Sequence, residues 1–394
     1  MKIIRQISAS IERINMAGKT GLKKTVKIRI GVLYGGRSGE HDVSLCSAAS
    51  VVAALDRKKY KVTAIGIDRD GRWYVQEKPE IIPDKDFGKK MALKKKGMWL
   101  VNHFEQKNKL HLYDIKNKNR EVVVDVVFPV IHGTFCEDGT LQGLLELAMV
   151  PYVGADVIGS AVGMDKDVAK RLLHEAGIPI VPSVTVNKQD WKENNRVIMK
   201  QALSRLGLPL FVKPVCAGSS MGVRKVKKKE ELAKAMNFAF QFDTCVMIEK
   251  AIDCREIECA VLGNEKPAGS VLGEIIPSHE FYSYEAKYID PDGAALNIPA
   301  KINKALSAKI RKIAVEGYMT LGCSSMARVD FFLDRKNNKF YLNEINTLPG
   351  FTSISMYPKL WAATGLKYSD LLDKLIALAI DRHKKKLEIK TEGI

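Results

Sequence analysis

Four polar side chains late in the chain have the types and spacing of a site for a metal and a phosphate. Arg328 and Asp330 are two residues apart, and so are Glu344 and Asn346. Side chains two apart on a β-strand point to the same face of the sheet. Carboxylate and amide oxygens are the hard ligands that Mg²⁺ prefers, whereas a guanidinium suits a phosphate or a developing oxyanion. On neighbouring strands, the two pairs would form a metal site beside an anion-stabilising arginine.

The segments that carry these pairs have the pattern of a β-hairpin. Residues 326–333 and 339–345 are rich in β-branched and aromatic side chains, and a polar turn over 334–338 separates them. A loop rich in turn-forming residues, 346–352, follows directly. The alternative is an amphipathic hairpin whose polar face is simply solvated. The rigid loop favours a site.

A glycine-rich loop follows the first predicted strand. The strand covers residues 27–34, the loop covers 35–42, and a helix follows over 43–55, with Asp42 or Ser44 as its cap. Strand, glycine loop and helix is the order in which α/β proteins bring ligands to strand ends. The loop lacks the G-x-G-x-x-G pattern, so a structural turn is an equally good interpretation.

A second loop of this kind follows a buried strand over residues 122–131. It covers residues 132–143 and leads into a helix over 141–148. Its histidine, His132, is a candidate site residue, although a lone histidine is more often structural. Both loops should open at the same edge of a parallel sheet, which predicts an α/β domain with a ligand site there.

Two lysines indicate a phosphate site further along the chain. Lys213 closes a predicted strand over 210–214, before the small-residue loop 216–223, and Lys166 lies in a predicted helix over 163–176. Small residues let backbone N–H groups approach an anion closely. Lysines combined with a divalent cation held by carboxylates bind nucleoside triphosphates in proteins without a P-loop.

Length and composition limit the class of protein. A chain of 394 residues predicts two or three domains, and 46% hydrophobic and 27% charged content is typical of globular proteins. The longest apolar run is far shorter than the roughly 20 residues that span a bilayer, and the N-terminus lacks the apolar core of a secretory signal. Seven cysteines without metal-ligand spacing indicate a reducing compartment. We expect a cytoplasmic protein with no membrane insertion.

The formal net charge of +18 is unusual and partly local. Residues 1–27 carry seven Lys and Arg against one Glu, and lysine runs occur at 94–96, 227–229 and 384–386. No aromatic residues interleave with these runs, as a groove for single-stranded nucleic acid would require. We interpret the runs as solvated faces and expect no nucleic-acid partner, with nucleic-acid binding as the alternative. Residues 1–27 are a basic N-terminal extension, either an amphipathic surface helix or a disordered segment.

The chain resembles the D-alanine–D-alanine ligases, within the ATP-grasp group of carboxylate–amine ligases. The motifs that carry the resemblance come in family order and cover residues 28 to about 380. They are GGRSGEHDVSL (35–45), HGTFCEDGTLQG (132–143), MDKDVAK (164–170), FVKPVCAGSSMGV (211–223), Glu249-Lys250 with Arg255-Glu256, FYSYEAKYI (281–289), RVDFF (328–332) and NEINTLPGFTSIS (343–355).

The resemblance implies an ATP-grasp fold that combines α/β and α+β architecture. It places a Rossmann-like parallel-sheet domain for substrate at 28–150, a central α+β domain at 151–245 and a C-terminal α+β domain with the metal and substrate sites at 246–394. The expected partners are the small molecules D-alanine and ATP, and the expected assembly is a homodimer.

The resemblance also implies a reaction in two steps. A D-alanine carboxylate attacks the γ-phosphate of ATP, and the amine of a second D-alanine then displaces phosphate from the acyl phosphate. ATP would be bound by Lys166, Lys213, Ser219, Ser220, Glu249, Lys250, Glu256 and Lys287. Two Mg²⁺ (or Mn²⁺) ions would be bound by Asp330, Glu344 and Asn346. The two D-alanines would be bound by Glu40, His41, Ser44, His132, Gly350, Ser355 and Met356. Catalysis would involve Glu40, Ser219, Tyr288 and Arg328.

Three positions bear on specificity and on departures from the family pattern. A tyrosine such as Tyr288 accompanies the dipeptide product in the family, whereas relatives that make D-Ala–D-lactate carry a different residue, which favours D-alanine as second substrate. A ligase that uses D-lactate or D-serine as second substrate is the alternative within the same class. Cys136 stands where the family usually has glycine, and Cys216 also departs. If Cys136 lines the substrate cleft, ATP and D-alanine should slow its alkylation. A nucleotide- or polyanion-binding protein without catalysis is the alternative from another class, and the charge of +18 supports it.

Overall fold

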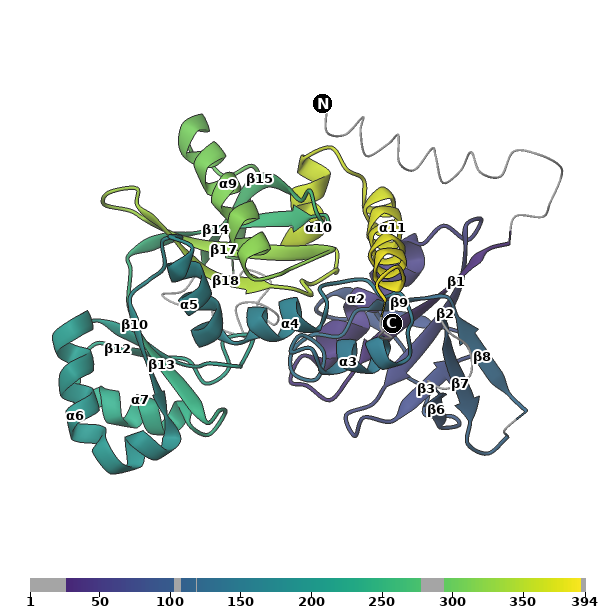
Figure 1. Cartoon of the computed structure of the whole chain (residues 1–394), viewed down its shortest axis with the longest axis horizontal. Coiled ribbons are helices and arrows are strands. Elements are labelled where there is room, and N and C mark those ends of the chain that lie inside the picture. Colours follow the sequence, from purple (N-terminus) through teal and green to yellow (C-terminus); the bar gives the residue numbers. More distant parts are fainter. Residues whose placement is uncertain (1–25, 103–107, 118, 278–293, 391–394) are drawn as a thin grey trace.

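The computed structural model describes residues 26–102, 108–117, 119–277 and 294–390 (Figure 1). These residues form three large sheets and the helices that cover them. Within the described part of the chain, no helix is long and apolar enough to cross a membrane. The predicted extension 1–27 lies outside the described residues except for its last two positions.

The N-terminal sheet has seven strands in the order β8-β7-β6-β3-β2-β1-β9. Its strands are β1 Ile28–Gly35, β2 Tyr60–Ile67, β3 Trp73–Gln76, β6 Trp99–Asn102, β7 Leu110–Asp114, β8 Glu121–Val124 and β9 Val126–Pro129. Strands β2, β1 and β9 run parallel, and the pairs from β2 out to β8 are antiparallel. The predicted parallel sheet is therefore confirmed for the three strands at the β9 end of the sheet. A small hairpin of β4 Ile81–Asp84 and β5 Gly88–Met91 packs on α2 His41–Ala54.

Two sequence predictions for this lobe are wrong in detail. The strand predicted over 122–131 is divided at Asp125, because this carboxylate accepts hydrogen bonds from the backbone N–H and the guanidinium of Arg29 at 2.6 to 3.0 Å. Helix α2 begins at His41, so Asp42 and Ser44 lie in its first turn rather than at its cap. The hydroxyl of Ser44 instead accepts from the N–H of Gly35 at 2.8 Å and donates to the carbonyl of Val130 at 2.5 Å.

The central sheet is antiparallel, in the order β10-β13-β11-β12. Its elements are β10 Ser183–Asn187, α6 Lys188–Leu206, β11 Leu210–Pro214, β12 Arg224–Val226, a 3₁₀ turn Lys229–Glu231, α7 Leu232–Ala239 and β13 Cys245–Lys250. Val212 and Ile248 point into the core under α6 and α7. Because side chains alternate along a strand, Lys213 and Glu249 point out of the opposite face. This second face of the central sheet contributes side chains to the candidate active site.

The C-terminal sheet has the order β16-β15-β14-β17-β18. Its elements are β14 Cys254–Leu262, β15 Ala268–Pro277, β16 Ala294–Asn297, α9 Lys304–Thr320, β17 Met326–Asp334, β18 Phe340–Asn346 and α10 Met356–Ala363. Strands β17 and β18 confirm the predicted hairpin. Apolar side chains such as Cys259 and Val329 face α9 and form the core, so the polar side chains between them face the other way.

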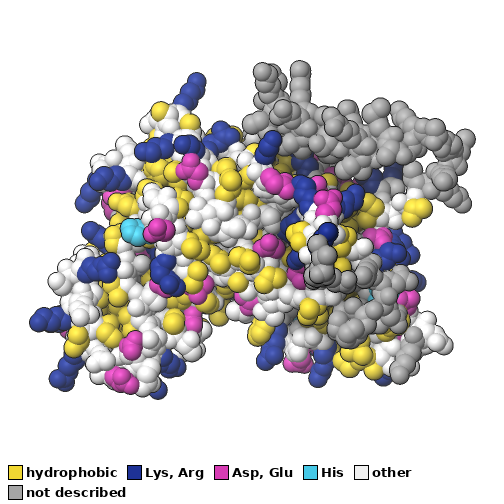
Figure 2. All heavy atoms as spheres, in the orientation of Figure 1, with side chains coloured by type: hydrophobic (Ala, Val, Ile, Leu, Met, Phe, Trp, Pro, Cys, Tyr) yellow, Lys and Arg dark blue, Asp and Glu magenta, His cyan; other side chains and the backbone are white. Residues whose placement is uncertain are grey.

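Helices connect the lobes (Figure 1). Helices α3 Thr140–Leu147, α4 Val157–Met164 and α5 Lys166–Glu175 lead from the N-terminal to the central sheet. Helix α11 Tyr368–Leu387 returns to the N-terminal lobe, where Leu371, Leu375 and Ile376 complete the core beneath β1 and β9. On the face shown in Figure 2, Lys and Arg are scattered among acidic and apolar side chains rather than gathered in one stripe.

Candidate active site

The hairpin brings the four residues predicted from sequence to one face of the C-terminal sheet. Arg328 pairs directly with Asn346, and Asp330 pairs directly with Glu344. Residues opposite one another on antiparallel strands share a face, with Cβ atoms roughly 5 Å apart. The ladder shifts register just after Asp330, so Asn343 is the extra residue on β18. We call these four residues, with Glu258 of β14, the carboxylate face.

Arg328 is held firmly on this face. Its Nε and Nη2 donate to the two carboxylate oxygens of Asp330 at 2.8 and 2.7 Å, and Nε also lies 3.1 Å from Oε2 of Glu258. Burial alone lowers the pKa of Arg328, but the neighbouring Asp330 and Glu258 carboxylates raise this pKa well above its ordinary value. The guanidinium therefore stays charged at any relevant pH.

The carboxylate face fits a hard divalent cation. Asp330, Glu344 and the amide oxygen of Asn346 are three oxygen donors, and Asn346 is oriented by the N–H of Leu348, which donates to its Oδ1 at 3.1 Å. Among the described residues, no group of three or more His, Cys, Asp or Glu side chains is arranged to hold a metal by itself. Mg²⁺ commonly takes only one or two carboxylates and completes its shell with phosphate oxygens and water. These three oxygen ligands thus suit a metal ion that is also coordinated by the phosphates of a bound nucleotide.

A buried lysine–glutamate cluster faces this site from the central sheet. Glu249 lies between Lys170 and Lys213, whose Nζ atoms are 2.5 and 2.7 Å from its two carboxylate oxygens. Burial raises the pKa of Glu249, but the two ammonium groups lower it more, and the net pKa is below the ordinary value. Lys213 also donates to Oδ1 of Asn343 at 3.5 Å, which links the cluster to β18. The cluster carries one net positive charge next to the carboxylate face.

Lys170 is a member of this cluster that sequence reasoning missed. It lies four residues after Lys166 on α5, so the two lysines share one helix face. This four-residue spacing was the feature of the sequence that could have indicated that Lys170 lies beside Lys166. The loop between β11 and β12 receives Lys166, whose Nζ donates to the carbonyl of Ala217 at 2.7 Å. Burial lowers the pKa of Lys166, and the like charge of Lys213 adds to this shift, although Glu344 opposes it.

The loop of residues 216–223 has an unusual backbone. Ser219 and Ser220 both have positive φ angles, 49° and 59°, in the left-handed region that non-glycine residues rarely adopt. Such backbone strain is concentrated at ligand sites. A Cβ atom on Gly218 would lie 3.0 Å from Oε1 of Glu40, so this loop meets the glycine-rich loop of the N-terminal lobe.

The predicted substrate residues of the N-terminal lobe are mostly buried. Glu40 immediately precedes α2, and Nδ1 of His41 contacts the carbonyl of Gly36 at 2.7 Å. His132 is buried between Oγ of Ser47, 3.1 Å from Nε2, and the carbonyl of Leu348, 3.0 Å from Nδ1. His132 therefore joins the N-terminal lobe to the loop after the hairpin.

The loop after the hairpin is organised by its own hydroxyls. Oγ of Ser355 accepts a hydrogen bond from the N–H of Thr352 at 3.0 Å. A Cβ on Gly350 would lie 2.7 Å from that hydroxyl, so the loop needs a glycine there. Met356 begins α10, and its methyl group would lie 2.3 Å from a Cβ on Gly273. Gly273 pairs with Glu258, so Met356 covers the sheet beside the carboxylate face.

Comparison with known proteins decides the family. Models of the D-Ala–D-Ala ligase N-terminus and C-terminus match residues 29–155 and 172–377. D-alanine–D-alanine ligase A of Escherichia coli strain K12 is 48% identical over 365 residues, which are 93% of this chain and 99% of that protein. The chain belongs to the D-alanine–D-alanine ligase family.

Further members of the D-alanine–D-alanine ligase family agree in sequence and in structure. The D-alanine–D-alanine ligase of Oceanobacillus iheyensis is 45% identical over 93% of this chain and 99% of its own. The solved D-alanine–D-alanine ligase of Coxiella burnetii has a TM-score of 0.76 at 39% identity, over 92% of this chain and 96% of that one. VanG D-Ala:D-Ser ligase of Enterococcus faecalis has a TM-score of 0.76 at 37% identity, over 90% and 100%. The predicted ATP-grasp fold is thereby confirmed.

Some residues predicted from the ligase resemblance are placed differently or not at all. Lys287 and Tyr288 lie outside the described residues. Lys250 is exposed, and Glu256 is half-buried on the same strand face as Glu258. The condition under which ligands would slow the alkylation of Cys136, a thiol that lines an open substrate cleft, is not met. The thiol of Cys136 is fully buried in the N-terminal core, and burial raises its pKa well above the ordinary value.

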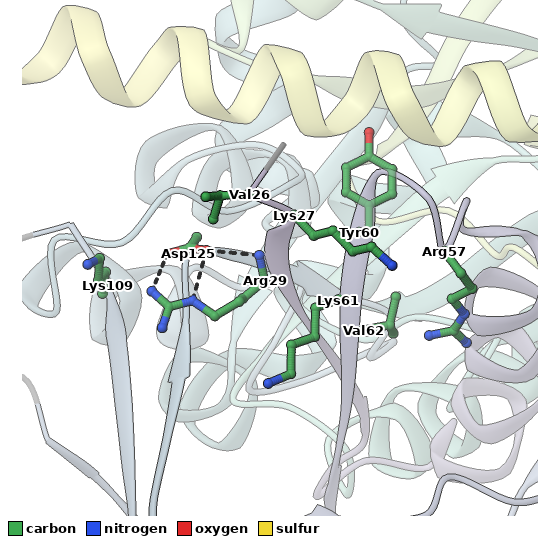
Figure 3. Close-up of a pocket in the computed structure, with 9 residues that line it drawn as sticks. All are labelled: Val26, Lys27, Arg29, Arg57, Tyr60, Lys61, Val62, Lys109 and Asp125. Atoms are coloured by element: carbon green, nitrogen blue, oxygen red, sulfur yellow. Dashed lines mark hydrogen bonds and ion pairs between the residues drawn. The ribbon is translucent and has the colours of Figure 1, made fainter. Parts of the chain in front are cut away.

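A cavity of this D-alanine–D-alanine ligase family member lies away from these residues. A pocket of about 890 Å³ lies where β1 and β2 begin, at the opposite end from the glycine-rich loop (Figure 3). Its lining is Val26, Lys27, Arg29, Arg57, Tyr60, Lys61, Val62, Lys109 and Asp125. Its one carboxylate among the lining residues, Asp125, accepts hydrogen bonds from Arg29, and the lining includes none of the residues predicted to bind metal or substrate.

Proposed function

We propose that this protein joins two D-alanine molecules into D-alanyl-D-alanine, with ATP converted to ADP and phosphate, in the synthesis of peptidoglycan precursors. Membership of the D-alanine–D-alanine ligase family supports this activity. The observation that carries it in the site is the position of the carboxylate face beside the cluster of Lys170, Glu249 and Lys213, linked by the contact from Lys213 to Asn343. A metal-bound triphosphate needs both groups at once.

The first chemical step is phosphoryl transfer. A carboxylate oxygen of the first D-alanine attacks the γ-phosphorus of ATP, the bond to the β-phosphate oxygen breaks, and an acyl phosphate and ADP form. Lys166, Lys213 and the loop of Ser219 and Ser220 bind the phosphates. Adenine and ribose are bound by Glu249, Lys250 and Glu256. Asp330, Glu344 and Asn346 would hold two Mg²⁺ ions, whose positive charge would offset the negative charge of the transferring phosphoryl group.

The second step is amide formation. The uncharged amine of the second D-alanine attacks the acyl carbon, the amine loses a proton, and phosphate leaves. Arg328 stabilises the tetrahedral oxyanion, which is usually the largest electrostatic contribution in acyl transfer. Glu40 binds the ammonium group of the first D-alanine, with His41, Ser44 and His132 shaping that end of the cleft. The second D-alanine is bound by Gly350, Ser355 and Met356.

The proposal is tested by phosphate release from purified protein. Release should require Mg²⁺, ATP and D-alanine together, and the product should have the mass of D-alanyl-D-alanine. An absence of D-alanine-stimulated turnover would refute the activity. The similarity to a D-Ala:D-Ser ligase supports D-serine as an alternative second substrate. Mass spectrometry after competition between D-alanine, D-serine and D-lactate distinguishes the three.

A variant tests the metal ligands directly. Glu344→Gln removes one charged donor and should lower turnover roughly 100-fold or more, because bound metal contributes several kcal/mol to the transition state. Glu230→Gln is the matched control, since Glu230 is exposed in the 3₁₀ turn of the central lobe and is not part of the carboxylate face. An unchanged rate in Glu344→Gln would exclude its role.

The remaining expectations are also proposals. We infer a cytoplasmic homodimer, with domains at 28–150, 151–245 and 246–394, although β13 starts at Cys245 and belongs wholly to the central sheet. Light scattering should give twice 43.9 kDa. A mass of one chain would reject the dimer.

A further inference from the structure

Glu258 is a buried carboxylate that has no role in the proposed reaction as described so far. It is only 4% exposed, and it pairs directly with Asp330 across β14 and β17. Its Oε2 lies 3.1 Å from Nε of Arg328. An ionised carboxylate is costly to bury unless a partner repays the desolvation, so its position next to the guanidinium needs an explanation.

The arrangement of Arg328 creates a conflict on the carboxylate face. The guanidinium donates to both oxygens of Asp330 at 2.8 and 2.7 Å. The same oxygens are the ones that a metal ion would need. A bidentate arginine–carboxylate pair is strong and geometrically fixed. A metal ion at Asp330 therefore competes with Arg328 for the two oxygens of this carboxylate.

The geometry around Glu258 offers Arg328 a second position. Nε of Arg328 donates to Oδ1 of Asp330 and already lies within ion-pair distance, 3.1 Å, of Oε2 of Glu258. The residue opposite Arg328 on β14 is Ala260, so no long side chain stands at that position of the strand that carries Glu258. A guanidinium released from Asp330 without another carboxylate would be an unpaired charge in a largely buried place, which is strongly unfavourable.

The neighbourhood of Glu258 also keeps water away from it. The residue opposite on β15 is Gly273, and the methyl group of Met356 occupies the space where a side chain would lie. Electrostatic interactions strengthen where water is excluded. The pairing of Glu258 with Arg328 is therefore stronger than that of an exposed ion pair.

We propose that Glu258 is a positioning residue, which holds the guanidinium of Arg328 when Asp330 binds metal. This inference rests on the proposed function, in which Asp330 is a metal ligand and Arg328 faces the oxyanion. Glu258 makes metal binding easier, because its carboxylate is a second ion-pair partner for the guanidinium of Arg328 when a metal competes for the oxygens of Asp330. It also keeps Arg328 on the carboxylate face for the second step.

The test is a double-mutant cycle on Mn²⁺ binding to the full-length protein in the presence of a non-hydrolysable ATP analogue. Electron paramagnetic resonance measures the Mn²⁺ dissociation constant of each variant. Glu258→Gln should weaken Mn²⁺ binding roughly 10-fold, as expected for a residue that orients a metal ligand's neighbour. Arg328→Met should remove that dependence, because Asp330 is then already free of the guanidinium. In the Arg328→Met background, Glu258→Gln should change the Mn²⁺ dissociation constant by less than about 2-fold.

Each result has a defined meaning. Equal weakening by Glu258→Gln with and without Arg328 would overturn the proposal, because Glu258 would then act on the metal through its charge alone. No weakening by Glu258→Gln would overturn it as well. If Glu258→Gln does not fold, Glu258→Asp replaces it, since the shorter side chain keeps the charge and loses the reach to Nε. Asp330→Asn serves as the reference arm. Unchanged Mn²⁺ binding there would refute the proposed metal site itself rather than the role of Glu258 alone.

Discussion

The buried cluster of Lys170, Glu249 and Lys213 allows a quantitative test by the change Glu249→Gln. Glu249 is 2% exposed, and its two carboxylate oxygens lie 2.5 and 2.7 Å from the two ammonium groups. Glutamine has nearly the same shape, so the cavity stays filled. The change removes the one negative charge between two buried cations.

The magnitude follows from the burial of the charges. Removing one partner of a buried ion pair costs about 3 to 5 kcal/mol. Burial already lowers the pKa of Lys170, with the charge of Lys213 adding to the shift and Glu249 opposing it. Without Glu249 one lysine therefore loses its proton more readily, which places the expected loss at the lower end, about 3 kcal/mol.

Hydrogen exchange with mass spectrometry measures this loss locally. The amides of β11 and β13, which flank the cluster, should lose about 3 kcal/mol of opening free energy, while those of β1 should not change. Glu175→Gln, an exposed change on α5, is the matched control. A loss below about 0.5 kcal/mol at pH 7 would refute the reasoning, because that is the range of ordinary surface substitutions.

The same cluster predicts a dependence on pH. The pKa of Glu249 is lowered in the folded protein from an ordinary value of 4.5. A carboxylate with a lowered pKa stabilises the fold fully above its unfolded pKa and loses this contribution as the pH falls through the folded pKa. The difference between wild type and Glu249→Gln should therefore be complete above pH 4.5 and shrink below it.

Two further predictions concern the N-terminal lobe. Cys136 should resist iodoacetamide in the native protein, with or without ligands, because its thiol is fully buried and burial raises its pKa. Cys216 should react first because this residue is exposed, even though partial burial of its thiol raises its pKa to about 12. Equal labelling rates of the two cysteines by peptide mass spectrometry would contradict this prediction. Ser44→Ala should lower the free energy of unfolding in urea by about 1 to 3 kcal/mol, since it leaves the buried N–H of Gly35 and carbonyl of Val130 without their partner. Ser50→Ala, which loses only a 3.4 Å contact within α2, is its control and should change stability less.

Local sequence pattern predicted the elements and the faces of the site well. The alternation of side chains over β17 and β18 placed Arg328, Asp330, Glu344 and Asn346 on one face, because a strand has a period of two residues. The strand β11 matches its predicted bounds, 210–214. These features depend only on neighbours along the chain.

Contacts between distant segments were not predictable in this way. Glu258 belongs to the site only because β14 pairs with β17 in one particular register. Oγ of Ser47 accepts from the N–H of Phe351, 304 residues later, and nothing near either residue indicates the other. The spacing of Lys170 from Lys166 indicated a shared helix face, but the contact of Lys170 with Glu249 depends on the position of β13 relative to α5. Tertiary packing decides such contacts, and a single sequence carries no record of it.

The position of α11 has a consequence for how the protein is made. Leu371, Leu375 and Ile376 of this helix complete the core of the N-terminal lobe. Arg382 donates to the carbonyls of Tyr152 and Gly154 at 2.9 and 2.5 Å and to Oγ of Ser324 at 2.7 Å. A ribosome makes all of β1 to β9 long before it makes α11. During synthesis, the apolar surface that α11 covers is therefore exposed on the N-terminal sheet until the end of the chain is made, and transiently exposed apolar surface of this kind is prone to aggregation.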